Sequence, residues 1–329
     1  MTQQEEVRVL GTAKIQQGVQ RAALMLWATA GLGMACNPAV TTTTPSRLTP
    51  VQLAELWVEP EAARDLFHGV GGSRLAPDPA GRYTVIEMKH GGYSRGYTVT
   101  DARDREWSVK FPPEAGTEIV ASRLHWGIGY HQPPIYLLKE WIAEKATSPN
   151  PQMPARFREK NPDFHGLDAG DSWSYFRNPF VGTPQLNGLL TLEAMLGNSD
   201  LKDPQNVIYT LKTPAEGASR WYVARDLGQT FGRTGVIDPP RGDIGVFEST
   251  PFIRGVDNGK VQFEYRGRHK ELFNNIRVAD VRWLCERLNR LTDKQWQDAF
   301  RAGGIESPMS DRFIRRMKQK IAEGLALKD

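Results

Sequence analysis

The stretch HGGYSRGYTVTDARDREWSVKF, residues 90–111, decides between two fold types for this 329-residue chain. Residues 92–96, GYSRG, fit the G-x-S-x-G pattern of a serine-hydrolase nucleophile elbow. An elbow requires a strand before the serine and a helix directly after it, so that the serine sits on a strained turn above the sheet. The segments on either side of Ser94 therefore decide whether this serine is a nucleophile.

Those flanking segments predict a hairpin. The stretch RYTVIEMK is rich in β-branched residues and predicts a strand over 83–88, and further strands are expected at 97–100 and 106–111. Because a strand follows the glycine-rich turn, the hydrolase hypothesis fails. Glycine has no Cβ, so the backbone N–H groups of such a turn can approach phosphates. The replacement hypothesis is a phosphate-binding loop that contains Gly91, Gly92, Ser94 and Gly96.

The strand after this turn ends in a lysine. Lys110 lies on the opposite strand face from Val109 and Phe111. A helix follows in TEIVASRLHWGIGY, with Glu118 in its first turn. Protein kinases hold the nucleotide phosphates with a strand lysine that is ion-paired to a helix glutamate, and Lys110 and Glu118 fit this pattern. Two alternatives stay open: Glu114 competes for the pairing role, and both residues would also fit an ordinary charged surface.

The second half of the chain adds acidic residues at matching positions. The stretch LNGLLTLEAMLGNSDLKDPQNVIYTL predicts a helix over 186–196, a polar loop and a strand over 207–211. In the loop, Asp200 precedes Asn206 by the spacing of a kinase catalytic loop, where the Asp accepts the substrate's hydroxyl proton and the Asn holds a metal ion. The strand in RWYVARDLGQTFG ends at Asp226, where a second oxygen ligand for Mg²⁺ or Mn²⁺ is expected.

Together these motifs resemble a family of uncharacterised proteins from environmental bacteria. The resemblance runs from about residue 56 to the C-terminus. That family is distantly similar to the atypical kinases, namely the phosphoinositide kinases, the HipA-type toxin kinases and the secretory-pathway casein kinases. Two segments carry the wider similarity: GNSDLKDPQN resembles their catalytic loop and DLGQTFG resembles their metal-binding segment.

The resemblance implies roles for individual residues. Asp200 would be the catalytic base, with Lys202 beside it, and Asn206 and Asp226 would hold the metal ion. Lys110 would contact the phosphates of ATP and Glu118 would orient it. One departure is Lys202, which stands where the relatives have a histidine and puts catalytic turnover in doubt.

The implied fold is α+β and bilobal, like that of protein kinases. An antiparallel sheet with one helix is expected over 51–145, and a mostly helical lobe over 146–329. The segment 135–141 is the best candidate for a strand near the adenine site, and 148–184 predicts a long connection between the lobes. The stretch FIRGVDNGKVQFEY predicts a hairpin at Asn258-Gly259, and Thr292 is expected to cap a helix.

The N-terminus suggests export. An apolar run over 22–35 has the length of a signal-peptide core and ends at Cys36. Residues 1–36 thus resemble a bacterial lipoprotein signal, except that Gly33 replaces the usual leucine, and the Thr/Pro-rich residues 37–50 predict a tether. We expect a membrane tether through Cys36 and a place in the cell envelope, with a buried helix of a cytoplasmic protein as the alternative.

Composition and charge restrict the partners. The net charge is +4, and the basic stretch RFIRRMKQK has apolar residues at helical spacing, so we expect a solvated helix face and no nucleic-acid partner. The two cysteines and six histidines form no cluster suited to zinc.

Three functions fit these observations. The first is a phosphotransferase that uses ATP with Mg²⁺ or Mn²⁺ and an unknown protein or small-molecule acceptor. The second is a non-catalytic, pseudokinase-type envelope lipoprotein that binds or scaffolds. The third is a nucleotidyl transferase that uses the same residues. Because a bacterial periplasm is not expected to contain ATP, lipid on Cys36 would favour the second function over the first.

Overall fold

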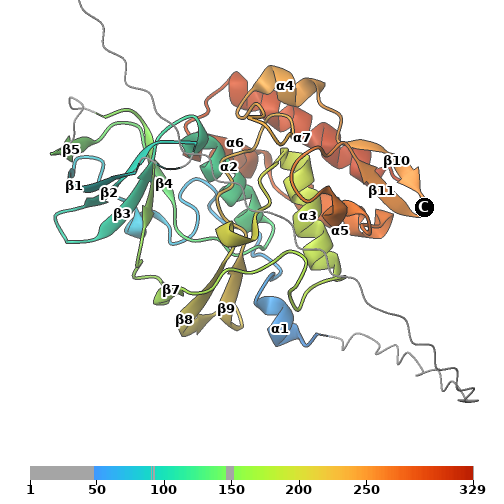
Figure 1. Cartoon of the computed structure of the whole chain (residues 1–329), viewed down its shortest axis with the longest axis horizontal. Helices are drawn as coiled ribbons and strands as arrows, with labels where there is room; N and C mark the ends of the chain where they lie inside the picture. The colour runs from blue at the N-terminus through green and yellow to red at the C-terminus, as the bar shows by residue number, and fades with distance from the viewer. Residues whose placement is uncertain (1–47, 90, 92, 146–151, 329) are drawn as a thin grey trace, which may run out of the picture. The chain divides into compact units, whose positions relative to one another are not determined.

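A six-stranded sheet contains the strand that carries Lys110 (Figure 1). Its strand order is β4-β6-β3-β2-β1-β5, and all neighbours are antiparallel except β1 and β5. The strands are β1 (Arg82–Lys89), β2 (Gly96–Thr100), β3 (Glu106–Lys110), β4 (Tyr136–Leu138), β5 (Ile142–Glu144) and β6 (Ala155–Glu159). The three strands expected around the glycine-rich turn are therefore confirmed as β1, β2 and β3.

The computed structural model describes residues 48–89, 91, 93–145 and 152–328. Gly92, Cys36 and nearly all of the expected signal and tether lie outside these residues. At the end of the expected tether, Thr49 caps a short helix, α1 (Pro50–Ala54). Among the described residues, no helix combines the length and apolar character that a membrane span needs.

The prediction of a plain connection over 148–184 was wrong in part. Residues 155–159 form β6, which pairs with both β3 and β4, so the sheet extends past residue 145. The sequence ARFRE hides this strand because two arginines occupy one of its faces, whereas a buried strand normally shows apolar residues there. Residues 167–169 in the same stretch form a further short strand, β7 (Leu167–Ala169).

Two smaller sheets complete the β structure. β7, β8 (Val207–Ala215) and β9 (Ala218–Val223) form an antiparallel sheet, and Asp226 follows β9. The expected hairpin is confirmed as β10 (Ile253–Asp257) and β11 (Lys260–Phe263). Its turn residues Asn258 and Gly259 have φ angles of 50° and 71°, the left-handed conformation that such tight turns require.

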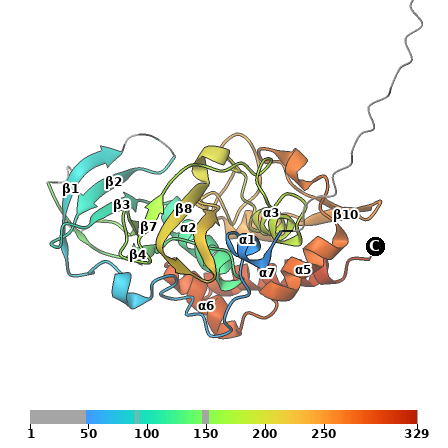
Figure 2. The same cartoon turned by 90° about the horizontal axis from the view of Figure 1, so that it is seen from below.

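The described residues contain seven α-helices, so the fold is of the mixed α+β class (Figures 1 and 2). The helices after α1 are α2 (Glu114–Gly127), α3 (Pro184–Leu196), α4 (Ile244–Ser249), α5 (Val278–Leu288), α6 (Asp293–Ala302) and α7 (Met309–Leu325). Short 3₁₀ turns lie at Ser73–Leu75, Asp203–Gln205 and Lys270–Phe273. Thr292 and Gln295 form the expected capping box of α6.

The molecule has two main apolar cores. One lies on the six-stranded sheet and is dominated by aromatic rings, and Phe157 contacts both Trp107 and Trp141 there. The other lies among α3, α5, α6 and α7 and includes Phe231, Phe300 and Phe313. The cavity described below is lined by side chains of the sheet and of the loops that border the helical core.

Helix α2 joins the two cores. It packs on β4 and β6 on one side and on α6 on the other, so its faces are buried almost all round. The contact with α6 is close because Gly116 faces Gly303; a Cβ on Gly116 would lie 2.5 Å from the Gly303 carbonyl oxygen. A helix buried on all sides has no apolar stripe, so its role as a central element is not visible in its sequence.

We predict that Gly116→Ala lowers the free energy of unfolding by about 1–3 kcal/mol, because the backbone of α6 must move away from the added methyl group. The matched control is Gly255→Ala in β10, where a Cβ meets no atom within 4 Å. Denaturant unfolding of the two variants beside the parent chain measures the difference. Equal losses in both variants would contradict the close helix contact.

Candidate functional site

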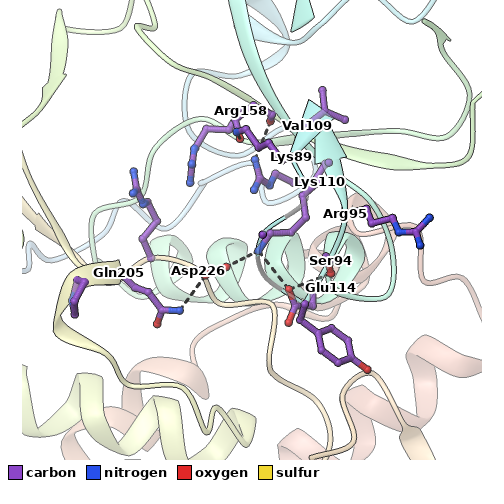
Figure 3. Close-up of a pocket in the computed structure, with 16 residues that line it drawn as sticks. Lys89, Ser94, Arg95, Val109, Lys110, Glu114, Arg158, Gln205 and Asp226 are labelled. Atoms are coloured by element: carbon purple, nitrogen blue, oxygen red, sulfur yellow. Dashed lines mark hydrogen bonds and ion pairs between the residues drawn. The ribbon is translucent and has the colours of Figure 1, made fainter. Parts of the chain in front are cut away.

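A cavity of about 290 Å³ lies beside the end of β3 and beneath the glycine-rich turn (Figure 3). It brings together parts of the chain far apart in sequence: the turn with Ser94 and Gly96, Lys110 on β3, Gln205 after α3, and Asp226 after β9. Its lining is strongly polar, with six cationic side chains and two carboxylates. Such a convergence of charged groups in one cavity marks a candidate functional site.

Lys110 is the centre of an ion network. Its Nζ lies 2.8 Å from Glu118 Oε2 and donates a hydrogen bond to Asp226, and Figure 3 shows its side chain pointing toward that carboxylate. Glu118 binds a second cation, because its Oε1 lies 3.1 Å from Arg156 Nε on β6. Four elements of the fold therefore meet at a chain of alternating charges: β3, α2, β6 and the segment after β9.

Burial makes these charges interact strongly. Burial opposes ionisation of Lys110, but Glu118 and Asp226 outweigh it and raise the pKa of the ammonium. For Glu118, burial is likewise outweighed by Arg156 and Lys110, which lower the pKa of its carboxyl to about 2. Both groups are thus ionised at neutral pH, and each stabilises the charge of the other.

Glu114, the alternative partner of Lys110, mainly contacts other residues. Its Oε2 is 3.5 Å from Lys110, farther than Glu118, and it accepts a hydrogen bond of 3.1 Å from the Ser94 hydroxyl. Its other oxygen lies 2.6 Å from Arg241, whose guanidinium sits 3.5 Å from the centre of the Tyr93 ring. Glu114 and Arg241 therefore hold the glycine-rich turn against the chain after Asp226. Ser94 contributes to this contact through its hydrogen bond to Glu114.

Gly96 brings the turn close to β3. A Cβ on Gly96 would lie 2.1 Å from the carbonyl oxygen of Val109, whereas a Cβ on Gly91 would meet nothing within 4 Å. The two glycines thus differ in kind. Gly96 is required for strand approach, and Gly91 leaves its backbone open to the cavity that it lines.

Asp200 is surrounded by donors. Its Oδ2 accepts hydrogen bonds from Lys202 at 2.8 Å and from Gln205 at 2.9 Å, and Arg268 Nε lies 3.4 Å from its Oδ1. The Gln205 amide also donates to Asp226 Oδ2 at 3.0 Å, so it bridges the two carboxylates. Asp200 and Asp226, 26 positions apart in sequence, are therefore held on either side of one amide.

Asn206 lies away from the cavity. It is buried, with 1 % of its surface exposed, and its amide donates to the Trp173 carbonyl at 3.2 Å. The neighbouring Gln205 faces the carboxylates instead. The metal-binding role of Asn206 stays a prediction, and the geometry adds Gln205 as a candidate for that role.

A buried chain of hydrogen bonds positions the loop that carries Asp200. His125 on α2 contacts Glu193 on α3 at 3.0 Å, and Glu193 accepts from Asn198 at 2.8 Å. Asn198 in turn accepts from the backbone N–H of Asp200 at 3.0 Å. His125 is fully buried and structural, and it couples α2 to the loop.

The segment after β9 is fixed to the same helix. Thr117 on α2 donates a 2.7 Å hydrogen bond to the Gly228 carbonyl, and a Cβ on Gly228 would lie 2.6 Å from that of Glu114. Asp226 itself has a φ angle of 62°, a left-handed conformation that is uncommon outside glycine. Such local strain is typical of functional positions.

The residues present fit a divalent cation. Gln205 Oε1 is buried and accepts no hydrogen bond, although the amide that carries it lies between Asp200 and Asp226. Amide orientation follows the surrounding hydrogen-bond network, and a half-turn would direct this oxygen to the space between the carboxylates. No cluster of three His, Cys, Asp or Glu side chains suited to a metal occurs among the described residues. Magnesium commonly uses one or two carboxylates and takes further ligands from substrate phosphates.

Several site residues escaped the sequence analysis, namely Gln205, Arg156, Arg158, Arg225 and Arg241. Gln205 directly precedes Asn206, the expected metal ligand. Because Asn206 fits the motif, the sequence analysis did not consider Gln205. The arginines had no signal in the sequence, because nothing in a single chain marks which of 42 basic residues converge in space.

Comparison with known proteins gives little. No family model and no curated protein matches the chain. Among solved structures, the chain is similar to the crystal structure of the Helicobacter pylori proinflammatory kinase CtkA, at 13% sequence identity and a TM-score of 0.35. The match covers 76% of this chain and 100% of that one.

We predict that Glu118→Gln lowers the free energy of unfolding by about 3–5 kcal/mol, because two buried cations lose their shared partner. The carboxyl pKa is depressed to about 2, so this contribution is complete above the unfolded pKa of about 4.3 and disappears as the pH falls toward 2. Chemical unfolding of both chains from pH 7 to pH 2 measures the difference.

Glu106→Gln is the control, since Glu106 pairs with Lys160 at the surface and both side chains are 39% exposed. This variant should lose less than about 1 kcal/mol of the free energy of unfolding. A Glu118 variant as stable as this control, or a loss that grows toward acid pH, would show that the network does not stabilise the fold.

We also predict that Gly96→Ala disturbs the site while Gly91→Ala leaves the fold intact. The methyl group of an alanine at position 96 must displace the backbone of β3 next to Lys110. We therefore expect the free energy of unfolding to fall by about 1–3 kcal/mol. Thermal unfolding of the two variants tests this. If the Gly91 variant loses as much as the Gly96 variant, the strand contact is not the cause.

Proposed function

We propose that this chain is a metal-dependent phosphotransferase that moves a phosphate from ATP to a hydroxyl group of an acceptor. One observation carries the proposal: Lys110, at the end of a strand beside a glycine-rich turn, contacts both Glu118 on the following helix and Asp226 after a later strand. Phosphoryl transfer needs positioned charge rather than covalent chemistry, and kinases use a strand lysine, a helix glutamate and a metal-binding aspartate for it.

The order of elements supports a kinase-like, bilobal arrangement. A glycine-rich hairpin, a lysine strand, a glutamate helix, a loop with Asp200 and a strand ending at Asp226 follow one another along the chain. This series of elements includes each charged group that kinases use for the transfer. We therefore propose that the sheet with α2 corresponds to the N lobe and the remaining helices to the C lobe.

In the proposed mechanism, Lys110 and the backbone of the glycine-rich turn hold the phosphates. Asp226, with the Gln205 amide, would hold Mg²⁺ or Mn²⁺, and the ion would neutralise charge on the phosphate oxygens. A second cavity of about 500 Å³ adjoins the first through Tyr93, Glu114, Gln205 and Asp226 and adds Asp200 and Lys202. The acceptor hydroxyl would lie there and transfer its proton to Asp200.

One observation favours a second candidate, a non-catalytic binding module. Asp200 is engaged by Lys202, Gln205 and Arg268, so an acceptor hydroxyl would have to displace partners that its carboxylate already has. A pseudokinase would bind the nucleotide without turnover. Location in the cell envelope, through lipid on Cys36, would support this candidate and can be tested by mass spectrometry of the chain isolated from its host.

We predict that ATP with Mg²⁺ or Mn²⁺ raises the melting temperature of the full chain and that Asp226→Asn abolishes the metal-dependent part of the shift. A ligand that binds only the folded state must stabilise it in proportion to occupancy. The variant keeps the side-chain size, and Asp203→Asn in the nearby turn, whose carboxylate accepts from Tyr175 N–H, is the control. No shift with either metal at millimolar ATP would overturn the proposal.

Turnover separates the two candidates. In the enzyme, the slow transfer of phosphate from ATP to water or to the chain itself should fall at least 100-fold in Asp200→Asn, because the base is lost (about 10²–10⁴-fold for a general base). In the binding module, the shift with ATP persists and no phosphate transfer is measured in either chain.

A further inference from the structure

The inner wall of the cavity carries an unexpected concentration of positive charge. Its cationic lining residues are Lys89, Arg95, Lys110, Arg156, Arg158 and Arg225, against the carboxylates of Glu114 and Asp226. The whole chain has a net charge of only +4, so this charge is local. A kinase site needs one lysine for the phosphates, and this cavity holds several cations beyond that need.

Strand register places three of these cations, Lys110, Arg156 and Arg158, on one face of the sheet. Lys110 pairs with Arg156 and Ser108 with Arg158 across β3 and β6, and residues two apart on a strand share a face. Lys89 on β1 reaches this wall too, since its Nζ donates to Ser108 Oγ at 3.2 Å. The wall formed by Lys89, Ser108, Arg156 and Arg158, which we call the cationic wall, is thus built by neighbouring strands.

The cations that line the cavity are unequally neutralised. Arg156 is paired with Glu118, and Lys110 with Glu118 and Asp226. Among the described residues, Lys89, Arg158 and Arg225 take part in no ion pair; Arg225 donates to the Tyr209 hydroxyl at 3.1 Å. Partly buried cations without a counter-ion repel one another, and an anion between them would remove that cost.

The ionisation behaviour agrees with crowded charge. Burial, together with the neighbouring Arg156 and Arg225, lowers the pKa of Arg158 to about 10. Burial and the neighbouring Arg158 lower the pKa of Lys89 in the same way. The pKa values of Arg158 and Lys89 are lowered because the two cations are buried close to others, and a bound anion would raise both values.

The cationic wall offers no slot for a nucleotide base. Pockets for flat organic groups are lined mostly by apolar side chains. Here the apolar residue on β3 beside the wall, Val109, is 1% exposed and belongs to the core on the other face of the sheet. The wall therefore presents hydrogen-bond donors and positive charge where an apolar surface would be needed.

We propose that the cationic wall is a phosphate subsite, so that the ligand's phosphate chain lies along β3 and β6 and any nucleoside part lies toward the mouth of the cavity. This inference rests on the proposed function in that both place phosphates near Lys110, and it names the ligand class as polyphosphate. Two sources share this chemistry, a nucleoside triphosphate bound phosphates-first and an inorganic polyphosphate.

The test uses the full chain and three probes: inorganic tripolyphosphate, ATP and adenosine, each titrated by calorimetry with and without Mg²⁺. We expect tripolyphosphate to bind and to compete with ATP, and adenosine to give no signal. Arg158→Gln should weaken tripolyphosphate binding about ten-fold or more, the effect of one charge-assisted contact. Arg103→Gln, an exposed arginine in the turn between β2 and β3, is the matched control and should change nothing.

A stability measurement without ligand guards against a structural role for the arginine. Because Arg158 has no carboxylate partner and is crowded by other cations, Arg158→Gln should melt at or above the temperature of the parent chain. A lower melting temperature would mean that the arginine holds the fold, and it would overturn the proposal. Lys89→Gln provides a second variant, and we expect it to lower the affinity for tripolyphosphate as well.

The outcomes separate this inference from the proposed function. If ATP binds with metal through Asp226 but adenosine competes and Arg158→Gln is neutral, a base stacks on the wall and the inference is wrong while the function stands. If tripolyphosphate needs Arg158 but Asp226→Asn and metal have no effect, the inference stands and the function fails. If no phosphate compound binds, both are wrong.

The affinities also distinguish the two sources of the phosphate chain. Equal affinity for ATP and tripolyphosphate identifies the phosphate chain alone as the ligand, whereas tighter ATP binding shows that the nucleoside adds contacts.

Discussion

The ion network of Lys110 with Glu118 and Asp226 holds the other parts of the site in place. The charges of Lys110 and Glu118 would be costly alone at their depth, because desolvation favours the neutral form. Together with Arg156 they form an alternating series in which each group offsets the burial of the next. Since the four residues come from β3, α2, β6 and the segment after β9, the network fixes how these elements meet.

Helix α2 transmits this geometry to the other half of the site. It carries Glu118 toward the sheet, Thr117 toward Gly228, and His125 toward the Glu193–Asn198 hydrogen bonds that hold the Asp200 backbone. The same helix thus sets the positions of both acidic segments. Its burial on all faces makes it a rigid support, because each of these contacts is satisfied inside the protein.

The charge of the cavity gives the site its chemical character. Carboxylates lie at one side and cations along the strands at the other, and the proposed metal-bound polyphosphate would span both. A mild net charge over the whole chain is compatible with this, because the opposing charges are distributed elsewhere on the surface. Function in such a site follows from the local arrangement of ions rather than from the composition.

Several local elements could be predicted from the sequence, namely the hairpin strands from their β-branched residues, the turn at Asn258-Gly259 and the α6 cap at Thr292. Each depends mainly on residues near to one another along the chain. Motif spacing also singled out Lys110, Glu118, Asp200 and Asp226. It missed β6, whose arginines obscure the strand pattern, and it passed over Gln205 beside Asn206. Which basic residues share a cavity depends on the three-dimensional packing of the chain. Electrostatic interactions act between atoms close in space, and separation along the chain does not give that distance.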